Sequence, residues 1–103
     1  AVCEGLAFGE ALGLDSESLV PTLAAGAAGN WFLDKRGATM MAQSYVPGFK
    51  SALLLKDLHI VQAMAEALGK EYSVVGQSLR DYQALVDAGF GEEDTSALIR
   101  LKR

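Results

Sequence analysis

Apolar and polar residues recur along the chain at helical spacing, and no segment alternates them with the period of two typical of a β-strand. The pattern predicts helices over residues 1–12, 30–41, 49–68 and 73 to about 88, with a short last helix reaching Leu101 and another helix following Gly13. The sequence therefore predicts an all-α fold, a bundle of about five or six helices.

Residues that favour helix ends separate these segments. Gly13 and Gly69 follow apolar runs and are expected to end helices, because glycine readily adopts the left-handed conformation. Asp15 or Ser18 can cap the second helix, Ser73 a later one, and Asp94 or Thr95 the last. Pro21 fits a first turn after Ser18 but would disturb a helix that begins at Asp15.

Small residues indicate where helices approach closely. Gly5 and Gly9 lie four residues apart, so they share one helical face and predict a close neighbouring helix. Gly37 lies within residues 30–41 and predicts an interruption of that helix. The small-residue segment 24–29 is expected to be a turn.

Composition narrows the class of protein. The 103 residues are 50% hydrophobic with a net charge of −4, which is typical of one folded domain and argues against disorder. No basic run exceeds two residues, so nucleic-acid binding is disfavoured, and no apolar run reaches membrane-spanning length. The one cysteine, Cys3, can form no intramolecular disulfide and is expected to be buried, which fits a reducing compartment.

Candidate chemistry concentrates in the longest predicted helix, residues 49–68. On a helical wheel one polar stripe, expected to face solvent, contains Ser51, His59, Gln62 and Glu66. Lys56 and Asp57 lie outside this stripe, among the apolar residues. Charges are seldom buried without partners, so this pair either forms ion pairs with a neighbouring helix or reaches the edge of the face, or else it faces a binding cleft.

Four blocks of residues stand out in order along the chain: Glu4, Ala11 and Gly13-Leu14-Asp15; Gly29-Asn30-Trp31; Gly48-Phe49, Leu54 and Lys56-Asp57-Leu58; and Gly89-Phe90-Gly91 followed by Asp94 and Ser96-Ala97-Leu98. In this order they resemble motifs of the β-hydroxyacid dehydrogenases. That family includes 3-hydroxyisobutyrate dehydrogenase, tartronate semialdehyde reductase and glyoxylate/succinic semialdehyde reductase. The short loop between Trp31 and Phe49 looks closer to the tartronate semialdehyde and glyoxylate reductase branch.

The resemblance implies an architecture like that of 6-phosphogluconate dehydrogenase, in which residues 1–103 are the helical C-terminal domain for substrate binding and dimerisation. An upstream Rossmann domain would bind NAD or NADP, and the family's catalytic lysine would precede Ala1. The implied partners are a small hydroxy acid or semialdehyde and further copies of the chain in a dimer or tetramer, with no nucleic acid or membrane. The implied location is the cytoplasm, or the mitochondrial matrix in a eukaryote.

The resemblance also assigns roles to individual residues. Lys56 matches a cofactor-contacting lysine, Asp57 a carboxylate beside the substrate, and Phe49 an aromatic wall of the substrate pocket. Trp31 and Asn30 match further substrate-binding positions and are equally expected as structural anchors. No catalytic residue and no metal ligand is expected within this chain, so these residues alone should not be catalytically competent.

Two other interpretations stay open. The parent could be a relative of the imine reductases or of 6-phosphogluconate dehydrogenase, which share the two-domain plan. Alternatively, the chain could be a non-catalytic helical association module. The presence of a glycine-rich dinucleotide loop and a catalytic lysine upstream would separate these interpretations.

Overall fold

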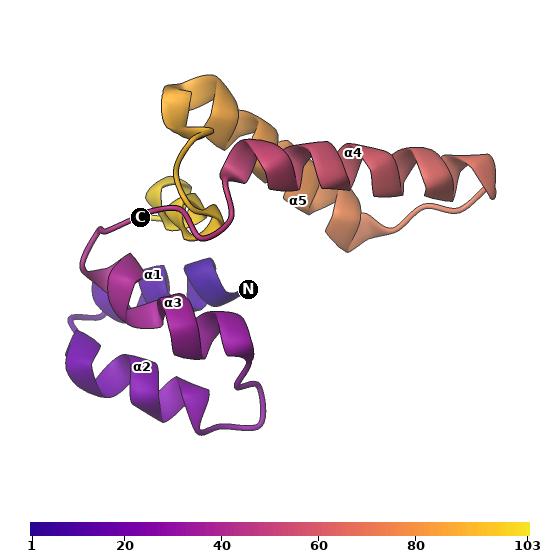
Figure 1. The fold of residues 1–103 in the computed structure, drawn as a ribbon. Helices are drawn as coiled ribbons and strands as arrows, with labels where there is room; N and C mark the ends of the chain where they lie inside the picture. The colour runs from indigo at the N-terminus through magenta and orange to yellow at the C-terminus, as the bar shows by residue number, and fades with distance from the viewer. The chain divides into compact units, whose positions relative to one another are not determined.

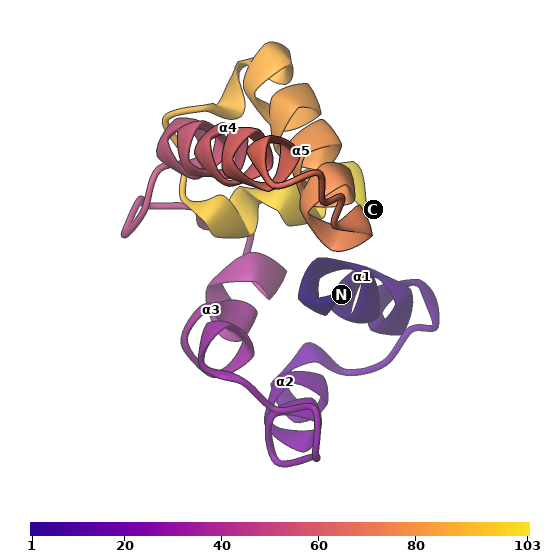
Figure 2. The same ribbon diagram turned by 90° about the vertical axis from the view of Figure 1, so that its right-hand side faces the viewer.

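A computed structural model describes all 103 residues, which form helices joined by short connections (Figures 1 and 2). The elements are α1 (Val2–Ala11), α2 (Ser16–Ala24), α3 (Trp31–Met41), α4 (Ser51–Ala67), α5 (Ser73–Leu85), a π-helical turn η1 (Val86–Phe90) and a 3-10 helix η2 (Thr95–Leu101). The predicted all-α fold is confirmed. None of these helices combines the length and apolar character that a membrane span requires.

The helices group into two compact units. The first contains residues 1–45 and 99–103, and the second contains residues 46–98. In the first unit α1, α2 and α3 pack against one another, around fully or nearly fully buried apolar side chains that include Leu6, Leu33, Met40 and Ile99. Cys3 is also buried here, as expected.

Side-chain caps fix two helix starts in the first unit. The Asp15 carboxylate accepts a hydrogen bond from the backbone N–H of Ser18 at 3.1 Å, so α2 begins immediately after Asp15. Pro21 consequently lies inside α2, where its missing N–H removes one backbone hydrogen bond. Asn30 caps α3 by accepting from the Leu33 N–H at 2.9 Å.

Glycines allow close helix packing at Gly9, as expected, and at Gly37, where an interruption was expected instead. A Cβ at Gly9 would lie 2.5 Å from a Leu19 methyl carbon, and one at Gly37 would lie 2.6 Å from a Val20 methyl carbon. Around Gly5 a Cβ would meet nothing within 4 Å, so the prediction of close packing is wrong for that residue. The predicted interruption at Gly37 is also wrong, because α3 continues through it and the glycine serves contact with α2.

The C-terminal residues complete the first unit. The Arg103 guanidinium donates to the Glu10 carboxylate at 3.1 Å, to the Tyr45 hydroxyl at 2.9 Å and to the Met40 carbonyl at 3.1 Å. Lys102 pairs with Glu4 at 3.2 Å. These contacts tie the chain end to α1 and to the end of α3.

The second unit is built on a hairpin of two long helices, α4 and α5, which pack side by side (Figure 1). Gly69 ends α4 with a positive φ of 66°, as predicted, and Gly89 breaks the helix after α5 with φ 96°. Ser73 is the first residue of α5 and forms no capping bond, so its predicted capping role is wrong; Tyr72 occupies the cap position. Asp94 caps η2, as one of the two alternatives predicted.

Two glycine substitutions separate helix propensity from packing. Gly5→Ala should raise the free energy of unfolding by about 0.5–1 kcal/mol, because alanine is the better helix former and space is free. Gly37→Ala gains the same propensity but must displace Val20, a stiff β-branched side chain, so we expect a net loss of about 1 kcal/mol. Urea denaturation of both variants measures the difference; equal stabilisation would contradict the close packing of α2 on α3.

Candidate functional site

Helix α4 buries part of its polar stripe and leaves much of its apolar surface exposed. Ser51 is fully buried and Gln62 is half-buried, so the expected solvent stripe is wrong for these two residues, whereas His59 and Glu66 are exposed. The side chains exposed on the opposite side are Leu53, Ile60, Val61, Met64 and Leu68. We call these five the outer face of α4. A helix face this apolar is normally covered by another protein surface.

Lys56 and Asp57 lie on α4 among these outer residues. The Lys56 ammonium is 3.3 Å from the Asp57 carboxylate, and the two side chains are 63% and 50% exposed. The pair is therefore formed within one helix and not with a neighbouring one. Exposed pairs of this kind contribute little to stability, so the charges remain available to a ligand.

A shallow hollow of about 530 Å³ runs along α4 beside Lys56. Its lining is mainly apolar and comprises Ala52, Leu55, Lys56, His59, Ile60 and Ala63. A cation at the edge of an apolar hollow suits a ligand with a flat apolar part and an anionic or hydroxylated part.

The loop before α4 is held by one buried carboxylate. Asp94 is 1% exposed, and its Oδ1 accepts hydrogen bonds from the backbone N–H groups of both Gly48 and Phe49, each at 3.0 Å. Its Oδ2 accepts from the N–H of Ser96 at 3.0 Å and from the Ser96 hydroxyl at 2.5 Å. All four donors are satisfied by a single side chain, which links the start of α4 to the start of η2.

Backbone pairing reinforces this link. The Phe49 carbonyl accepts from the Thr95 N–H at 2.9 Å, and the Ser51 N–H donates to the Glu93 carbonyl at 2.8 Å. The buried Ser51 hydroxyl lies 3.1 Å from the carbonyls of Glu93 and Asp94, which explains why a polar residue occupies this inward position. The Phe49 side chain remains 40% exposed, so its backbone is fixed while its ring projects.

Two opposing effects set the pKa of Asp94. Burial alone would raise this pKa, because the low dielectric disfavours the charged form. The hydrogen bonds from the Ser96 hydroxyl and from the N–H groups of Phe49, Ser96 and Gly48 outweigh burial and hold the pKa of Asp94 below its ordinary value. The carboxylate is therefore ionised at neutral pH.

The remaining two predicted site residues belong to the first unit. Asn30 uses its side chain to cap α3 and also donates to the Ala28 carbonyl at 3.2 Å, so it has the anchoring role expected as one alternative. Trp31 is 65% exposed, and the Arg36 guanidinium lies 5.4 Å from its ring centroid. The indole is therefore presented on the surface of the first unit.

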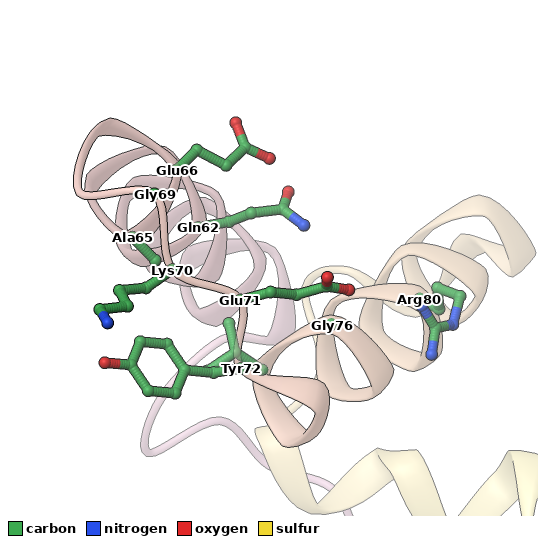
Figure 3. A pocket seen from close by; sticks show the side chains of 10 residues that line it. Gln62, Ala65, Glu66, Gly69, Lys70, Glu71, Tyr72, Gly76 and Arg80 are labelled. Atoms are coloured by element: carbon green, nitrogen blue, oxygen red, sulfur yellow. The ribbon is translucent and has the colours of Figure 1, made fainter.

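A second hollow, of about 410 Å³, lies between the end of α4 and the start of α5. In Figure 3 the side chains of Gln62, Glu66 and Glu71 extend to the same side, toward Arg80, whereas Lys70 and Tyr72 point away. Arg80 also donates to the Gln77 side chain at 2.9 Å. None of the five predicted site residues lines this hollow, so it is distinct from the site on α4.

The sequence predicted Asp94 only as a possible helix cap and missed its bonds to Gly48 and Phe49. Its sequence separation of 45 from Phe49 hides the contact from any local pattern. Ser51 was missed for the same reason, since its partners Glu93 and Asp94 are equally distant. The only available signal was that Gly48-Phe49 and Asp94 both fall within family-like motifs.

Comparisons with known proteins agree with this fold. Residues 1–102 match the family model described as NAD-binding of NADP-dependent 3-hydroxyisobutyrate dehydrogenase. An uncharacterized oxidoreductase of Synechocystis is 31% identical over all of this chain and 35% of its own length. The 2-hydroxy-3-oxopropionate reductase of Escherichia coli K12 is 30% identical over 97% of this chain and 34% of its own length.

A solved structure shares the fold. The crystal structure of 3-hydroxyisobutyrate dehydrogenase from Salmonella typhimurium superposes with a TM-score of 0.91 at 24% identity, covering 97% of this chain and 35% of that one. The chain thus spans about a third of the length of the relatives it matches, 35% and 34% of the two curated proteins.

The lowered pKa of Asp94 predicts how acid affects stability. A carboxyl whose folded pKa lies below its unfolded value, which is about 4, stabilises the fold fully above that value. This stabilisation is lost as the pH falls through the lower folded pKa. Asp94→Asn should therefore cost about 1–3 kcal/mol of unfolding free energy near pH 6 and progressively less toward pH 3. Urea denaturation across this range measures it, and a cost independent of pH would contradict the assignment.

Proposed function

Because this chain belongs to the family of NADP-dependent 3-hydroxyisobutyrate dehydrogenase, we propose that it completes the active site of an NAD(P)-dependent 3-hydroxyacid dehydrogenase or semialdehyde reductase. The observation that carries the proposal is the composition of the surface around the start of α4. This surface exposes the side chains of Phe49, Lys56 and Asp57, at least in part. Exposed apolar side chains of α4 lie beside them. A surface that combines a projecting aromatic, a cation and a carboxylate is suited to a small anionic substrate and its cofactor.

Each of these residues has a defined part in the proposed chemistry. The bound nicotinamide cofactor would exchange a hydride with the carbonyl or carbinol carbon of the substrate. Lys56 fits such a cofactor, because its exposed ammonium can bind phosphate or ribose oxygens at the edge of the apolar hollow. Asp57 would accept hydrogen bonds and orient neighbouring groups, and Phe49 would exclude water from the reacting centre.

The rest of the active site would come from other parts of the parent protein. This sequence contains no GxGxxG loop to hold the cofactor pyrophosphate, and the resemblance puts the general acid and base, a lysine, upstream of Ala1. Residues 1–103 alone are accordingly expected to bind substrate and cofactor only weakly and to turn over neither.

We further propose that the second half of α4 contacts another copy of the chain. The outer residues Ile60, Met64 and Leu68 are 51%, 65% and 77% exposed, and they carry no charge. This apolar stripe continues the outer face beyond the Lys56–Asp57 pair, so one helix would serve the active site with its first half and oligomerisation with its second. Burial of three such side chains would stabilise an interface by several kcal/mol, on the order of 1.5–3 kcal/mol each.

Substitution of Lys56 tests the catalytic proposal, and the chain provides a matched control. Lys35 and Asp34 form the same kind of adjacent pair, 3.1 Å apart and 55% and 58% exposed. In the full-length protein, Lys56→Gln should lower kcat/KM about 10- to 100-fold, mainly through the KM for the cofactor, because a charge-assisted hydrogen bond is lost. Lys35→Gln should leave the kinetics unchanged.

Steady-state rates provide the measurement, with NAD+ and NADP+ against a panel of 3-hydroxyacids and with NADH and NADPH against a panel of semialdehydes. If both lysine variants behave alike, Lys56 has no role in the site. If the full-length protein turns over no substrate of the panel, the alternative of a non-catalytic association module is favoured instead.

The oligomer proposal is tested by placing a charge in the apolar stripe. Met64→Lys in the full-length protein should lower the sedimentation mass at micromolar concentration, because a buried unpaired charge opposes association. Val74→Lys, at an α5 position that is 78% exposed, is the control and should leave the mass unchanged. An unchanged mass for Met64→Lys would place the interface elsewhere.

A further inference from the structure

We propose that Asp94 is a positioning residue for the substrate pocket and that it acts through the backbone of Phe49. The inference rests on the proposed function, in which Phe49 walls that pocket. It concerns a carboxylate that lies outside the exposed surface of the site: Asp94 is 1% exposed, so it reaches no substrate itself.

Phe49 is held in place by hydrogen bonds of its backbone. It lies in the segment before α4, where no helical hydrogen bonds fix the backbone, and its side chain is 40% exposed. Its two backbone polar groups are both bonded to the segment that starts η2. The N–H donates to Asp94 Oδ1 at 3.0 Å, and the carbonyl accepts from the Thr95 N–H at 2.9 Å. These bonds therefore fix the backbone from which the ring projects.

The two oxygens of the Asp94 carboxylate bind different segments of the chain, and we call the bonds of each oxygen the Oδ1 arm and the Oδ2 arm. Oδ1 accepts from the N–H groups of Gly48 and Phe49, and Oδ2 accepts from the N–H and the hydroxyl of Ser96. Two successive backbone N–H groups converging on one anionic oxygen form a rigid concave turn. The Oδ1 arm thus fixes the pocket residue, whereas the Oδ2 arm caps η2.

The segment that holds Phe49 also holds the start of α4, the helix that carries Lys56 and Asp57. Ser51, the first residue of α4, bonds to the backbone of Glu93 and Asp94, and α4 then continues without interruption through Lys56 and Asp57. Phe49 and the start of α4 are consequently both bonded to residues 93–95, but only Phe49 depends on the Asp94 carboxylate, because Ser51 binds backbone carbonyls. Catalytic geometry is sensitive to such placement, since a displacement of about 1 Å can cost about 100-fold in rate.

Separate substitutions can remove the two arms in the full-length protein. Asp94→Ser keeps a short oxygen that can cap η2 but cannot reach Gly48 and Phe49, so it removes the Oδ1 arm. Asp94→Asn keeps one acceptor oxygen for those two N–H groups and is the rescue variant. Ser96→Ala removes the hydroxyl partner of Oδ2 and leaves the Oδ1 arm intact.

We expect Asp94→Ser to lower kcat/KM about tenfold or more and Asp94→Asn to restore most of that loss. Ser96→Ala should lower the melting temperature but leave kcat/KM within about twofold of wild type. In a double-mutant cycle, Asp94→Ser combined with Phe49→Ala should be no slower than Phe49→Ala alone, because both changes remove the same contribution.

Losses of kcat/KM that add in this cycle, or an equal loss in Ser96→Ala, would overturn the positioning role and leave Asp94 a purely structural residue. Absence of turnover by the wild type would instead refute the proposed function, so the two failures are distinguishable. If Asp94→Ser does not fold, Asp94→Glu takes its place in the cycle, since it keeps the charge but shifts the carboxylate by one methylene.

Discussion

The arrangement of the second unit depends on the hydrogen bonds that converge on the buried carboxylate of Asp94. A buried charge is tolerated only when its oxygens are satisfied, and here four donors from two distant segments meet that need. Because three of these donors are backbone N–H groups, the carboxylate fixes the path of the chain and not merely a side-chain contact. Gly48 and Phe49, which lie just before Lys50 and the start of α4, are therefore fixed by this one anchor.

A second set of bonds to the same segment fixes the orientation of α4. Its first turn must bring Ser51 inward, where the hydroxyl meets the carbonyls of Glu93 and Asp94. Rotation of a rigid helix is then determined along its whole length, so Lys56, Met64 and their apolar neighbours face outward. Leu55 also lies on the inward side and is buried, so apolar packing and the hydrogen-bonded corner at the start of α4 act together. The outer apolar residues are left for another surface to cover.

Local chemistry made much of this fold predictable from sequence. Gly13 and Gly69 adopt positive φ angles and, like the cap at Asp15, depend on residues a few positions away. The orientation of α4 was not predictable, because it depends on contacts between residues more than 40 apart in sequence. The same limit applies to the site. Phe49, Lys56 and Asp57 could be proposed from their motif, but the carboxylate that fixes Phe49 could not.

Geometry within a pair of charges does not by itself distinguish a site from an ordinary surface. Lys56–Asp57 and Lys35–Asp34 are both adjacent in sequence, comparably close and comparably exposed. The two pairs differ in their surroundings. Lys56 borders an apolar hollow, and a fixed aromatic residue, Phe49, precedes it in the chain. A ligand bound there would displace water from the Lys56 ammonium and would lose its own water in turn. Removal of water strengthens the interaction of a cation with an anionic partner several-fold. The function proposed for α4 therefore depends on the exposed apolar surface around its charges as well as on the charges themselves.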